Sequence, residues 1–411
     1  MDRKIKVAFI KFAGLCTGGT EKFLQSIAAN LPNDKFIVDY FYCDAAPYVN
    51  SDYKHIDTDP ERLKYMIDHN VNLIKFNVGF KDVTVSTHNW LNTNFWDVFK
   101  EEDYDVVITG RAGHREYPFY LIKKTPIIDT LHLNAGADNQ RNIKKVIHLS
   151  EWHAKKWIKT GGDRQKVEVI CQPLNIVDFI KENYREKFGL INKFIFGFHQ
   201  RNDDYIFSPM PLEAYAQIEN EKNHFVLLNG SIKYREQAQK LGIKNITFLP
   251  FAKKLEEIYN FLQMLDVYTH GRKDGETSGA AIAEAMAFGL PIISHFTKYN
   301  NGQLETIGPA GKMVKNLKQY VDEMKKHETD EVYHKELSEI AKNRFINRYS
   351  FERQIKKIEN IITDVADNKV KYESNPWFNC LSILYQIKYK IKCKLGRNVK
   401  LFIRMLGKKN I

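Results

Sequence analysis

The residues with the most informative spacing lie at 266–294, in the stretch DVYTHGRKDGETSGAAIAEAMAFGLPIIS. A run typical of a buried strand leads into a polar loop and then into a helix of small residues expected at 279–288. Gly279 at the start of this helix allows a ligand to approach the backbone, and either Thr277 or Ser278 is expected to cap it. The N–H groups and the dipole of such a helix end favour a diphosphate.

Two carboxylates accompany this helix start. Glu276 precedes it, and Glu284 lies well inside the helix. A carboxylate beside a diphosphate would repel it, so we expect both to accept hydrogen bonds from hydroxyl groups, which sugars and ribose supply. The plain alternative is a capped helix with two incidental acids, and the spacing of the glutamates alone does not decide between the two.

Three further features follow other expected strands. Gly18 and Gly19 open the first helix and would let a ligand approach the backbone, although a tight turn is the alternative, and the G-x-G-x-x-G spacing of a dinucleotide site is absent. His132 ends a strand, where a histidine is often structural. Arg201 follows another strand, and its permanent charge suits a leaving diphosphate.

Strand-like runs alternate with helical segments in both halves of the chain. In the first half, strands are expected at 6–12, 36–42, 72–76, 105–109, 126–131, 145–149 and 167–171. In the second half, they are expected at 194–198, 224–228, 246–249, 266–269 and 291–294. Helices are expected at 21–31, 151–159 with Ser150 as N-cap, 212–218, 233–241 and 255–264. This alternation predicts an α/β fold with doubly wound parallel sheets.

A chain of 411 residues is too long for one ordinary core, and polar residues at 183–193 separate the two series of strands. We therefore expect Rossmann-like domains at 1–185 and 190–350, facing a cleft. The content of 43% hydrophobic and 27% charged residues excludes collagenous, coiled-coil and mostly disordered proteins. The sequence predicts no transmembrane helix and no signal peptide, and five scattered cysteines fit a reducing cytoplasm.

Nine of the twelve net positive charges lie in the last 35 residues, which contain no acid. Apolar residues recur there every three or four positions, and the segment 375–411 therefore predicts a basic amphipathic helix on an anionic membrane surface. A helix docked on the protein with solvated lysines is the alternative, and nucleic-acid binding is the least favoured interpretation.

No metal or cofactor is predicted. Asp57-Thr58-Asp59 imitates a D-x-D metal site, but Pro60 follows at once, so Asp59 is interpreted as a helix N-cap with proline at the first helical position. The histidines show no spacing of the H-E-x-x-H kind.

The stretch that begins at Glu276 resembles the donor-binding motif of the GT-B retaining glycosyltransferases of family 4. The matching positions are Glu276, Gly279, Glu284-Ala285-Met286-Ala287, Gly289 and Pro291. Gly18-Gly19-Thr20-Glu21 is similar to the Gly-Gly-x-Glu loop of that family, and His132 and Arg201 stand where the family has the histidine beside the reacting sugar and the arginine of its Gly-Arg loop. Tyr349-Ser350-Phe351-Glu352 resembles the start of its last helix, expected at 351–370, which crosses back to the first domain.

The resemblance implies a GT-B enzyme that moves a sugar from a nucleotide diphosphate to a hydroxyl acceptor with retention and without a metal. It implies that His132, Arg201 and Glu276 are catalytic and that Glu284 contacts the ribose. Where the family has a lysine, this chain has Ile206, so either Lys273 or Arg272 supplies the second cation or the leaving group is less strongly stabilised here.

The implied setting is the assembly of surface polysaccharide, lipopolysaccharide or capsule, with a glycan or lipid-linked acceptor on the inner face of the membrane. Two other activities fit the same residues. One is a nucleotide-sugar 2-epimerase of the same fold, and the other is a non-catalytic protein that binds glycans or nucleotide sugars.

Overall fold

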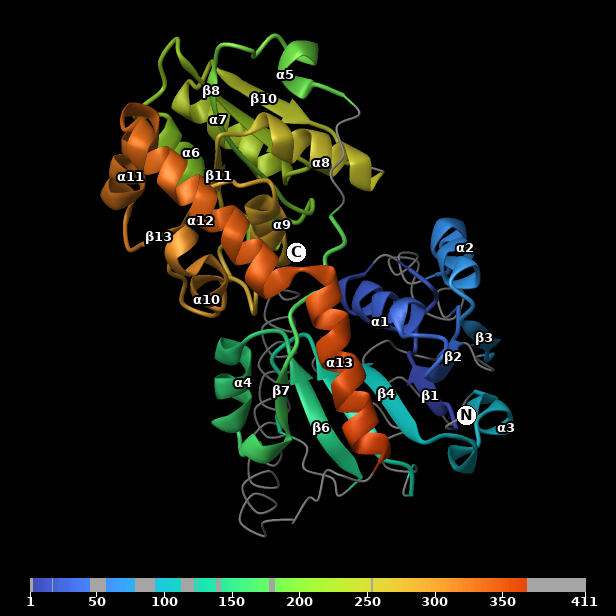
Figure 1. Cartoon of the computed structure of the whole chain (residues 1–411). Helices are drawn as coiled ribbons and strands as arrows, with labels where there is room; N and C mark the ends of the chain where they lie inside the picture. The colour runs from blue at the N-terminus through green and yellow to red at the C-terminus, as the bar shows by residue number, and fades with distance from the viewer. Residues whose placement is uncertain are drawn as a thin grey trace, which may run out of the picture. The chain divides into compact units, whose positions relative to one another are not determined.

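The computed structural model describes residues 3–16, 18–44, 57–77, 93–111, 122, 124–137, 142–176, 182–252 and 254–367. The described residues form two units (Figure 1). The first unit ends at Ile170 and resumes at Ile355, and the second covers Cys171–Gln354. The predicted tail at 375–411 lies outside the described residues.

The first unit is built on a parallel sheet of β-branched and aromatic residues. Its described strands number seven, in the order β3-β2-β1-β4-β5-β6-β7. They are β1 (Ile5–Ile10), β2 (Phe36–Tyr42), β3 (Asn72–Lys75), β4 (Val106–Arg111), β5 (Ile127–Leu131), β6 (Ile143–His148) and β7 (Val167–Val169). Central strands such as β1 and β5 are buried almost throughout, as expected of a parallel sheet with both faces covered.

The helices of the first unit follow the strands that they connect. They are α1 (Gly19–Asn30), α2 (Pro60–Asp68), α3 (Phe95–Val98) and α4 (Glu151–Ile158), with short 3₁₀ turns η4 (Glu101–Asp103) and η6 (Arg164–Lys166). Ser150 caps α4 by accepting a hydrogen bond from the N–H of His153, as predicted. Asp59 caps α2 with Pro60 in its first turn, which confirms that this aspartate is part of a helix cap.

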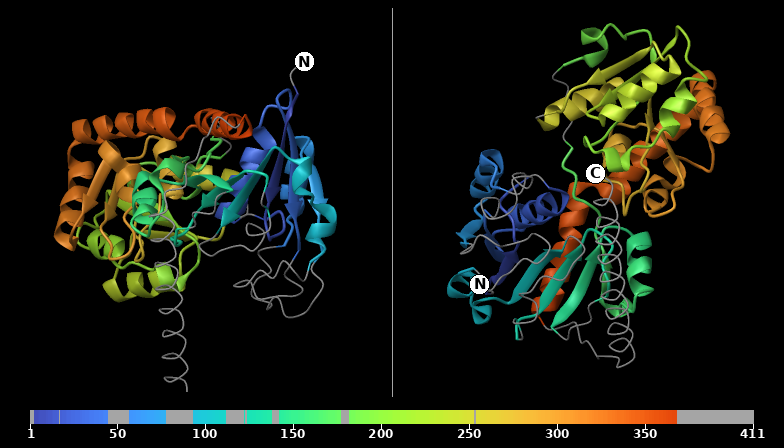
Figure 2. Two further views of the ribbon diagram at one scale, coloured as in Figure 1. Left: turned by 90° about the horizontal axis from the view of Figure 1, so that it is seen from below. Right: turned by 180° about the vertical axis from the view of Figure 1, so that it is seen from behind.

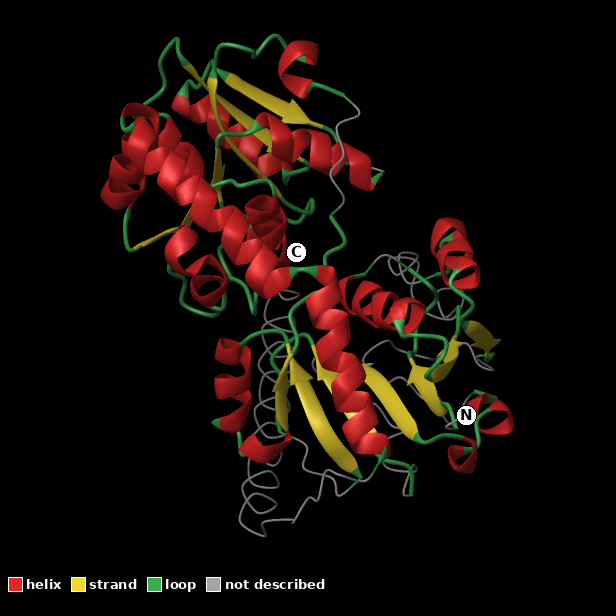
Figure 3. Ribbon diagram, in the orientation of Figure 1, coloured by secondary structure: helices red, strands yellow, loops and turns green. Residues whose placement is uncertain are grey.

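The second unit repeats the design with another parallel sheet (Figure 3). Its described strands number six, in the order β10-β9-β8-β11-β12-β13. They are β8 (Phe194–His199), β9 (Asn223–Leu228), β10 (Ile246–Leu249), β11 (Val267–Thr269), β12 (Ile292–His295) and β13 (Gly311–Val314). The predicted α/β class with two doubly wound sheets is thus confirmed.

The helices of the second unit pack on this sheet around one continuous apolar core. They are α5 (Tyr184–Lys187), α6 (Met210–Tyr215), α7 (Ile232–Leu241), α8 (Leu255–Met264), α9 (Ala280–Ala287), α10 (Gln303–Ile307), α11 (Leu317–Thr329) and α12 (Glu331–Tyr349), with η7 (Asp204–Ile206) and η8 (Gly308–Ala310). No helix in the described part of the chain is long and apolar enough to cross a membrane.

The boundary between the units lies before the polar stretch at 183–193. Those residues are not a linker, because Asn183 caps α5 and Arg185 of that helix forms an ion pair with Asp266 at 2.8 Å. The second unit begins instead at Cys171, whose N–H donates to the side chain of Gln354 at 2.9 Å.

One helix belongs to both units. It is α13 (Phe351–Ala366), whose residues from Ile355 onward belong to the first unit, where the helix runs along one face of the sheet (Figures 1 and 2). Ile358 and Ile362 are fully buried there, and Lys35 forms an ion pair with Glu359 at 2.8 Å. The helix expected at 351–370 therefore exists and returns the chain to the first unit.

Candidate functional site

Each sheet reverses its strand order once, and polar loops follow the strands at the reversal. In the first unit β1 lies beside β4, and in the second β8 lies beside β11. Ligands of open parallel sheets bind outside the carboxyl ends of the strands at such a point. Gly18 follows β1, Arg201 follows β8 and Glu276 follows β11. These predicted residues therefore lie at the carboxyl ends of the strands where each sheet reverses its order.

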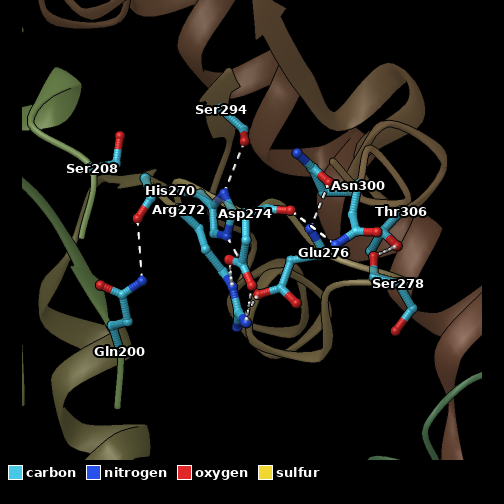
Figure 4. Close-up of polar contacts among 12 residues, drawn as sticks. Gln200, Ser208, His270, Arg272, Asp274, Glu276, Ser278, Ser294, Asn300 and Thr306 are labelled. Carbon is cyan, nitrogen blue, oxygen red and sulfur yellow. Dashed lines mark hydrogen bonds and ion pairs between the residues drawn. The ribbon is translucent and has the colours of Figure 1, made fainter. Parts of the chain in front are cut away.

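Glu276 is held by a histidine and an arginine of its own loop (Figure 4). Its Oε1 lies 3.2 Å from Arg272 Nη1 and 3.7 Å from His270 Nε2. Burial alone would raise the pKa of the Glu276 carboxyl, but the hydrogen bond to His270 and the charge of Arg272 outweigh it and lower the pKa. The carboxylate is therefore ionised at neutral pH. Because both contacts fall on Oε1, Oε2 can accept a hydrogen bond from a ligand hydroxyl.

Arg272 is already neutralised by carboxylates. Its guanidinium binds Asp274 through Nε at 2.6 Å and Nη2 at 3.0 Å, in addition to Glu276. Burial would lower the pKa of Arg272, but these two carboxylates raise it above its ordinary value. Arg272 therefore positions the loop, and of the two cations considered as a replacement for the family lysine, it is the less suited to a diphosphate.

The loop that carries Glu276 is fixed by a second loop. The side-chain amide of Asn300 donates to the carbonyl oxygen of Asp274 at 2.9 Å, and the N–H of Gly302 donates to that of Glu276 at 2.8 Å. Gly275 has φ +66°, and a Cβ atom there would stand 1.8 Å from the carbonyl oxygen of Asn300. The position therefore requires glycine, and this close packing preorganises the carboxylate.

The helix α9 begins at Ala280, one residue later than the start at 279 expected from the sequence. Its N-cap is Gly279, with φ +103° and no side chain to accept a hydrogen bond, so the prediction that Thr277 or Ser278 caps the helix is wrong. The chain turns through a left-handed residue here, and the carbonyl of Ser278 accepts a hydrogen bond from Thr306 instead. An oxygen of a ligand can therefore approach the N–H groups of the first turn of α9.

Glu284 lies on α9 and is oriented by a histidine at the end of β8. Its Oε2 is 3.1 Å from Nε2 of His199, and the hydroxyl of Tyr268 donates to the carbonyl of His199 at 3.2 Å. The Glu284 side chain is one-fifth exposed. It can therefore hold His199 with one oxygen and accept from a ligand hydroxyl with the other.

The two predicted cations lie on neighbouring loops of the second unit. Arg201 is 66% exposed and forms an ion pair with Asp203 at 2.8 Å. Ile206 is buried in the core, which is why no charge can stand at that position. The N–H of Lys273 donates to the carbonyl of Ile206 at 3.0 Å. The backbone of the exposed Lys273 therefore lies beside Ile206, which stands where the resembled family has a lysine.

The glycine loop of the first unit, Gly18-Gly19, lies next to the ion pair between Lys11 and Glu21. A Cβ on Gly18 would stand 2.1 Å from Oε2 of Glu21, whereas one on Gly19 would meet nothing within 4 Å. Glu21 lies 3.5 Å from Nζ of the buried Lys11, which donates to the carbonyl of Gly110 at 2.9 Å. Gly18 thus leaves room for the Glu21 carboxylate, and Gly19 leaves its own side open to a ligand.

His132 follows β5 and is 6% exposed, with its ring edge-on to Phe23 of α1 at 4.9 Å between centroids. Burial, together with the charge of Lys11 and the neighbouring His153, lowers the pKa of His132 to about 3. The imidazole is therefore neutral at physiological pH.

The structure brings the predicted residues of the second unit together in one place. Lys273, Glu276, Thr277, Ser278 and Gly279 share the loop before α9, and Glu284 follows on that helix. Gly18, Gly19 and His132 belong to the first unit. Sequence reasoning missed His199 and His270, which orient the two glutamates. Their signal was available, because both stand at the carboxyl ends of predicted strands.

Residues 182–344 match the family model described as "Glycosyl transferases group 1". This match covers most of the second unit and includes Arg201, Lys273, Glu276 and Glu284. No curated protein matches the chain as a whole at a significant level.

Solved structures similar to the chain extend over nearly its whole length. A glycosyltransferase from Rickettsia africae has a TM-score of 0.69 at 16% identity and covers 89% of this chain and 100% of its own. Anabaena Alr3699/HepE, solved with UDP and glucose, has a TM-score of 0.64 at 16% identity over 88% and 100%. WaaB, described as a lipopolysaccharide outer core galactosyltransferase, has a TM-score of 0.62 at 16% identity over 88% and 99%. The fold is therefore GT-B.

Proposed function

We propose that the protein is a glycosyltransferase that moves a sugar from a nucleotide diphosphate sugar to a hydroxyl acceptor. The observation that carries this proposal is the pair of ionised or hydrogen-bonded glutamates, Glu276 and Glu284, on either side of the uncapped start of α9. The segment lies within the region that matches the glycosyltransferase group 1 model. Carboxylates suit the hydroxyl groups of a sugar and a ribose, and the helix start suits the diphosphate between them.

In this proposal the second unit binds the donor. The diphosphate lies against the first turn of α9, Oε2 of Glu276 accepts from a hydroxyl of the sugar, and Glu284 accepts from the ribose. Arg201 and Lys273 supply positive charge as the diphosphate leaves, because Arg272 is already paired with two carboxylates. Arg201 would have to exchange its exposed contact with Asp203 for the phosphate.

The glycine loop and His132 serve the reacting sugar. Gly19 leaves the backbone open to the donor, and the neutral imidazole of His132 can take part in hydrogen bonding near the anomeric carbon without repelling the positive charge that develops there. The acceptor hydroxyl oxygen attacks that carbon from the face that the diphosphate leaves, so the glycosidic bond replaces the carbon–phosphate oxygen bond with retention. A donor phosphate oxygen takes the proton. The reaction needs neither a metal nor a cofactor.

The donor is best sought among uridine nucleotides first, because Anabaena Alr3699/HepE, a structure of the same fold, was solved with UDP-glucose. The likeness to lipopolysaccharide glycosyltransferases supports a glycan acceptor in surface polysaccharide assembly. A panel of nucleotide sugars is to be tested by thermal shift, since a ligand that binds the native state raises the melting temperature. The proposal fails if no nucleotide or nucleotide sugar shifts the transition.

Substitution of the two glutamates tests their separate roles. Glu284→Ala should weaken UDP and UDP-sugar alike, because both contain the ribose. Glu276→Ala should leave UDP affinity nearly intact and lower turnover, because its partner is the sugar. The exposed Glu339→Ala on α12 is the matched control and should change neither. Equal losses of both ligands in the Glu276 and Glu284 variants would overturn the assignment.

Incubation with donor alone separates transfer from the two other activities. A transferase leaves the donor intact or hydrolyses it slowly, and consumes it when an acceptor is present. Appearance of the epimeric nucleotide sugar would identify a 2-epimerase. Binding without consumption in the presence of any membrane or glycan acceptor would identify a non-catalytic binding protein.

The basic segment at 375–411 is proposed to hold the enzyme on the inner face of the membrane, where a lipid-linked acceptor would be presented. Each lysine or arginine near an anionic surface contributes about 1 kcal/mol, and salt weakens the attraction. Liposome co-sedimentation of the full chain should depend on anionic lipid, and a chain ending at Asn368 should lose it while keeping nucleotide-sugar binding. Failure of the full chain to bind anionic vesicles would remove the membrane from the proposal.

A further inference from the structure

A cavity of about 470 Å³ lies beside the donor loop of the second unit. Its wall contains residues 207–209, 273 and 295–298, of which none is acidic and two are lysines, Lys273 and Lys298. Both lysines are exposed, and within the described part of the chain neither ammonium group has an ion-pair partner. The cavity therefore carries uncompensated positive charge, which favours an anionic ligand.

Apolar rings form a second part of the wall. Phe207, Pro209 and Phe296 line the cavity, and Phe296 is 41% exposed. Ring faces of this kind pack against the C–H faces of small cyclic ligands, whereas a free phosphate would leave them uncovered and the volume mostly empty. The cavity thus fits a ligand with a ring-sized body as well as a negative charge.

A buried serine supplies an acceptor with a defined orientation. His295 Nδ1 lies 3.1 Å from the carbonyl oxygen of Phe296, and because a carbonyl only accepts, Nδ1 carries the proton. Burial lowers the pKa of His295, so the ring is neutral and Nε2 accepts from the hydroxyl of Ser208 at 2.9 Å. The hydroxyl hydrogen of Ser208 is thus used in the hydrogen bond to His295, and the Ser208 oxygen can accept from a hydroxyl in the cavity.

The wall is tied to the donor loop and preformed. The N–H of Ser208 donates to the hydroxyl of Tyr234 at 3.2 Å, and the N–H of Lys273 donates to the carbonyl of Ile206 at 3.0 Å. Lys273 stands on the same loop as Glu276, the residue assigned above to the transferred sugar. The cavity therefore adjoins the loop that carries Glu276.

We propose that this cavity is a subsite for an acidic donor sugar, a hexuronic acid, whose carboxylate is bound by Lys298 and one of whose hydroxyls donates to Ser208. Lys273, which also serves the diphosphate, adds to the positive charge of the subsite. The inference rests on the proposed transfer from a nucleotide sugar and narrows its donor class. A carboxylate beside the Lys298 ammonium group makes a charge-assisted hydrogen bond, whereas the CH₂OH group of a neutral hexose would leave that ammonium group without a counter-charge.

Matched donor pairs test the subsite on the full chain. UDP-glucuronate and UDP-glucose differ only at C6, as do UDP-galacturonate and UDP-galactose, and GDP-mannuronate and GDP-mannose extend the test to a second base. Isothermal titration should show the acidic member of a pair bound about tenfold tighter. In Lys298→Met the preference should fall to about threefold, whereas the exposed Lys315→Met, on the same unit, should keep it.

The outcomes separate the subsite from the activity. Equal affinity of the acidic and neutral members, with nucleotide binding intact, overturns the subsite and leaves the proposed function standing. An equal effect of Lys298→Met and Lys315→Met also overturns it, because the preference would then reflect general surface charge. Absence of binding by any nucleotide or nucleotide sugar overturns the proposed function and this inference together.

Discussion

Removing the imidazole of His132 should flatten the pH dependence of stability in the first unit. The pKa of His132 is lowered from 6.5 to about 3 by burial, with the charge of Lys11 and the neighbouring His153 adding to the effect. In the unfolded chain the ring recovers its ordinary pKa. Unfolding therefore takes up a proton once the pH falls below about 6.5, and stability declines from there down to about pH 3.

The size of this decline follows from the two pKa values. At about pH 5.5, one unit below the unfolded value, His132 lowers the free energy of unfolding by about 1.4 kcal/mol relative to pH 7.5. His153, whose pKa is lowered to about 4, adds a similar amount, for a total of about 3 kcal/mol. Carboxylates do not titrate in this window, so histidines dominate the change.

Hydrogen exchange of peptides from β1, β4 and β5 measures this free energy at about pH 7.5 and pH 5.5, after correction for intrinsic exchange rates. His132→Asn should remove about half of the loss in the free energy of unfolding between about pH 7.5 and pH 5.5. If the variant is less stable at both pH values, the test still holds, because it compares only the difference between them. His327→Asn is the control, because the pKa of His327 is also lowered to about 3 but the residue lies on α11 of the second unit. A wild-type first unit equally stable at both pH values would refute the reasoning.

Three further tests have defined outcomes. Gly275→Ala, at φ +66° against a backbone oxygen, should destabilise the second unit by about 2–3 kcal/mol in thermal unfolding, whereas Gly189→Ala, at φ +68° with open space around it, should cost only about 1 kcal/mol. Arg201→Ala should lower turnover about 10²–10³-fold with donor binding largely kept, and unchanged turnover would remove it from the mechanism. Ser150→Ala should cost the first unit about 1 kcal/mol through its lost helix cap, measured by urea unfolding.

Elements with a strong local pattern could be predicted from the sequence. The strands Phe36–Tyr42 and Ile246–Leu249 and the helix Leu255–Met264 have the predicted bounds. The helix caps Ser150 and Asp59 were also predicted, because such residues act on the N–H groups two or three positions ahead. The strand β13 was not predicted. It has four residues and begins with Gly311, whose lack of a side chain lets it pack against the backbone of Ile292 in the neighbouring strand β12.

The site was predicted in its residues but not in its contacts. The spacing of Glu276 and Glu284 marks them, and His270, the partner of Glu276, stands earlier in the same loop. His199, the partner of Glu284, comes from the end of β8 and becomes a neighbour only through the sheet order. The cap of α9 could not be predicted for a similar reason. Gly279 is the N-cap with φ +103°, and the turn before it is anchored by Thr306 of α10, whose hydroxyl donates to the carbonyl of Ser278 from 28 residues further along the chain.

The interrupted first unit has a consequence for synthesis on the ribosome. Its sheet is complete once residue 170 has emerged, but the turns of α13 that bury Ile358 and Ile362 in this unit are translated only after the whole of Cys171–Gln354. The second unit is one uninterrupted segment whose two ends meet where Cys171 contacts Gln354, so it can fold as soon as it is free of the exit tunnel. The first unit is therefore synthesised first but completes its folding last. Until α13 has been made, the face of its sheet that this helix covers stays exposed while the second unit is synthesised.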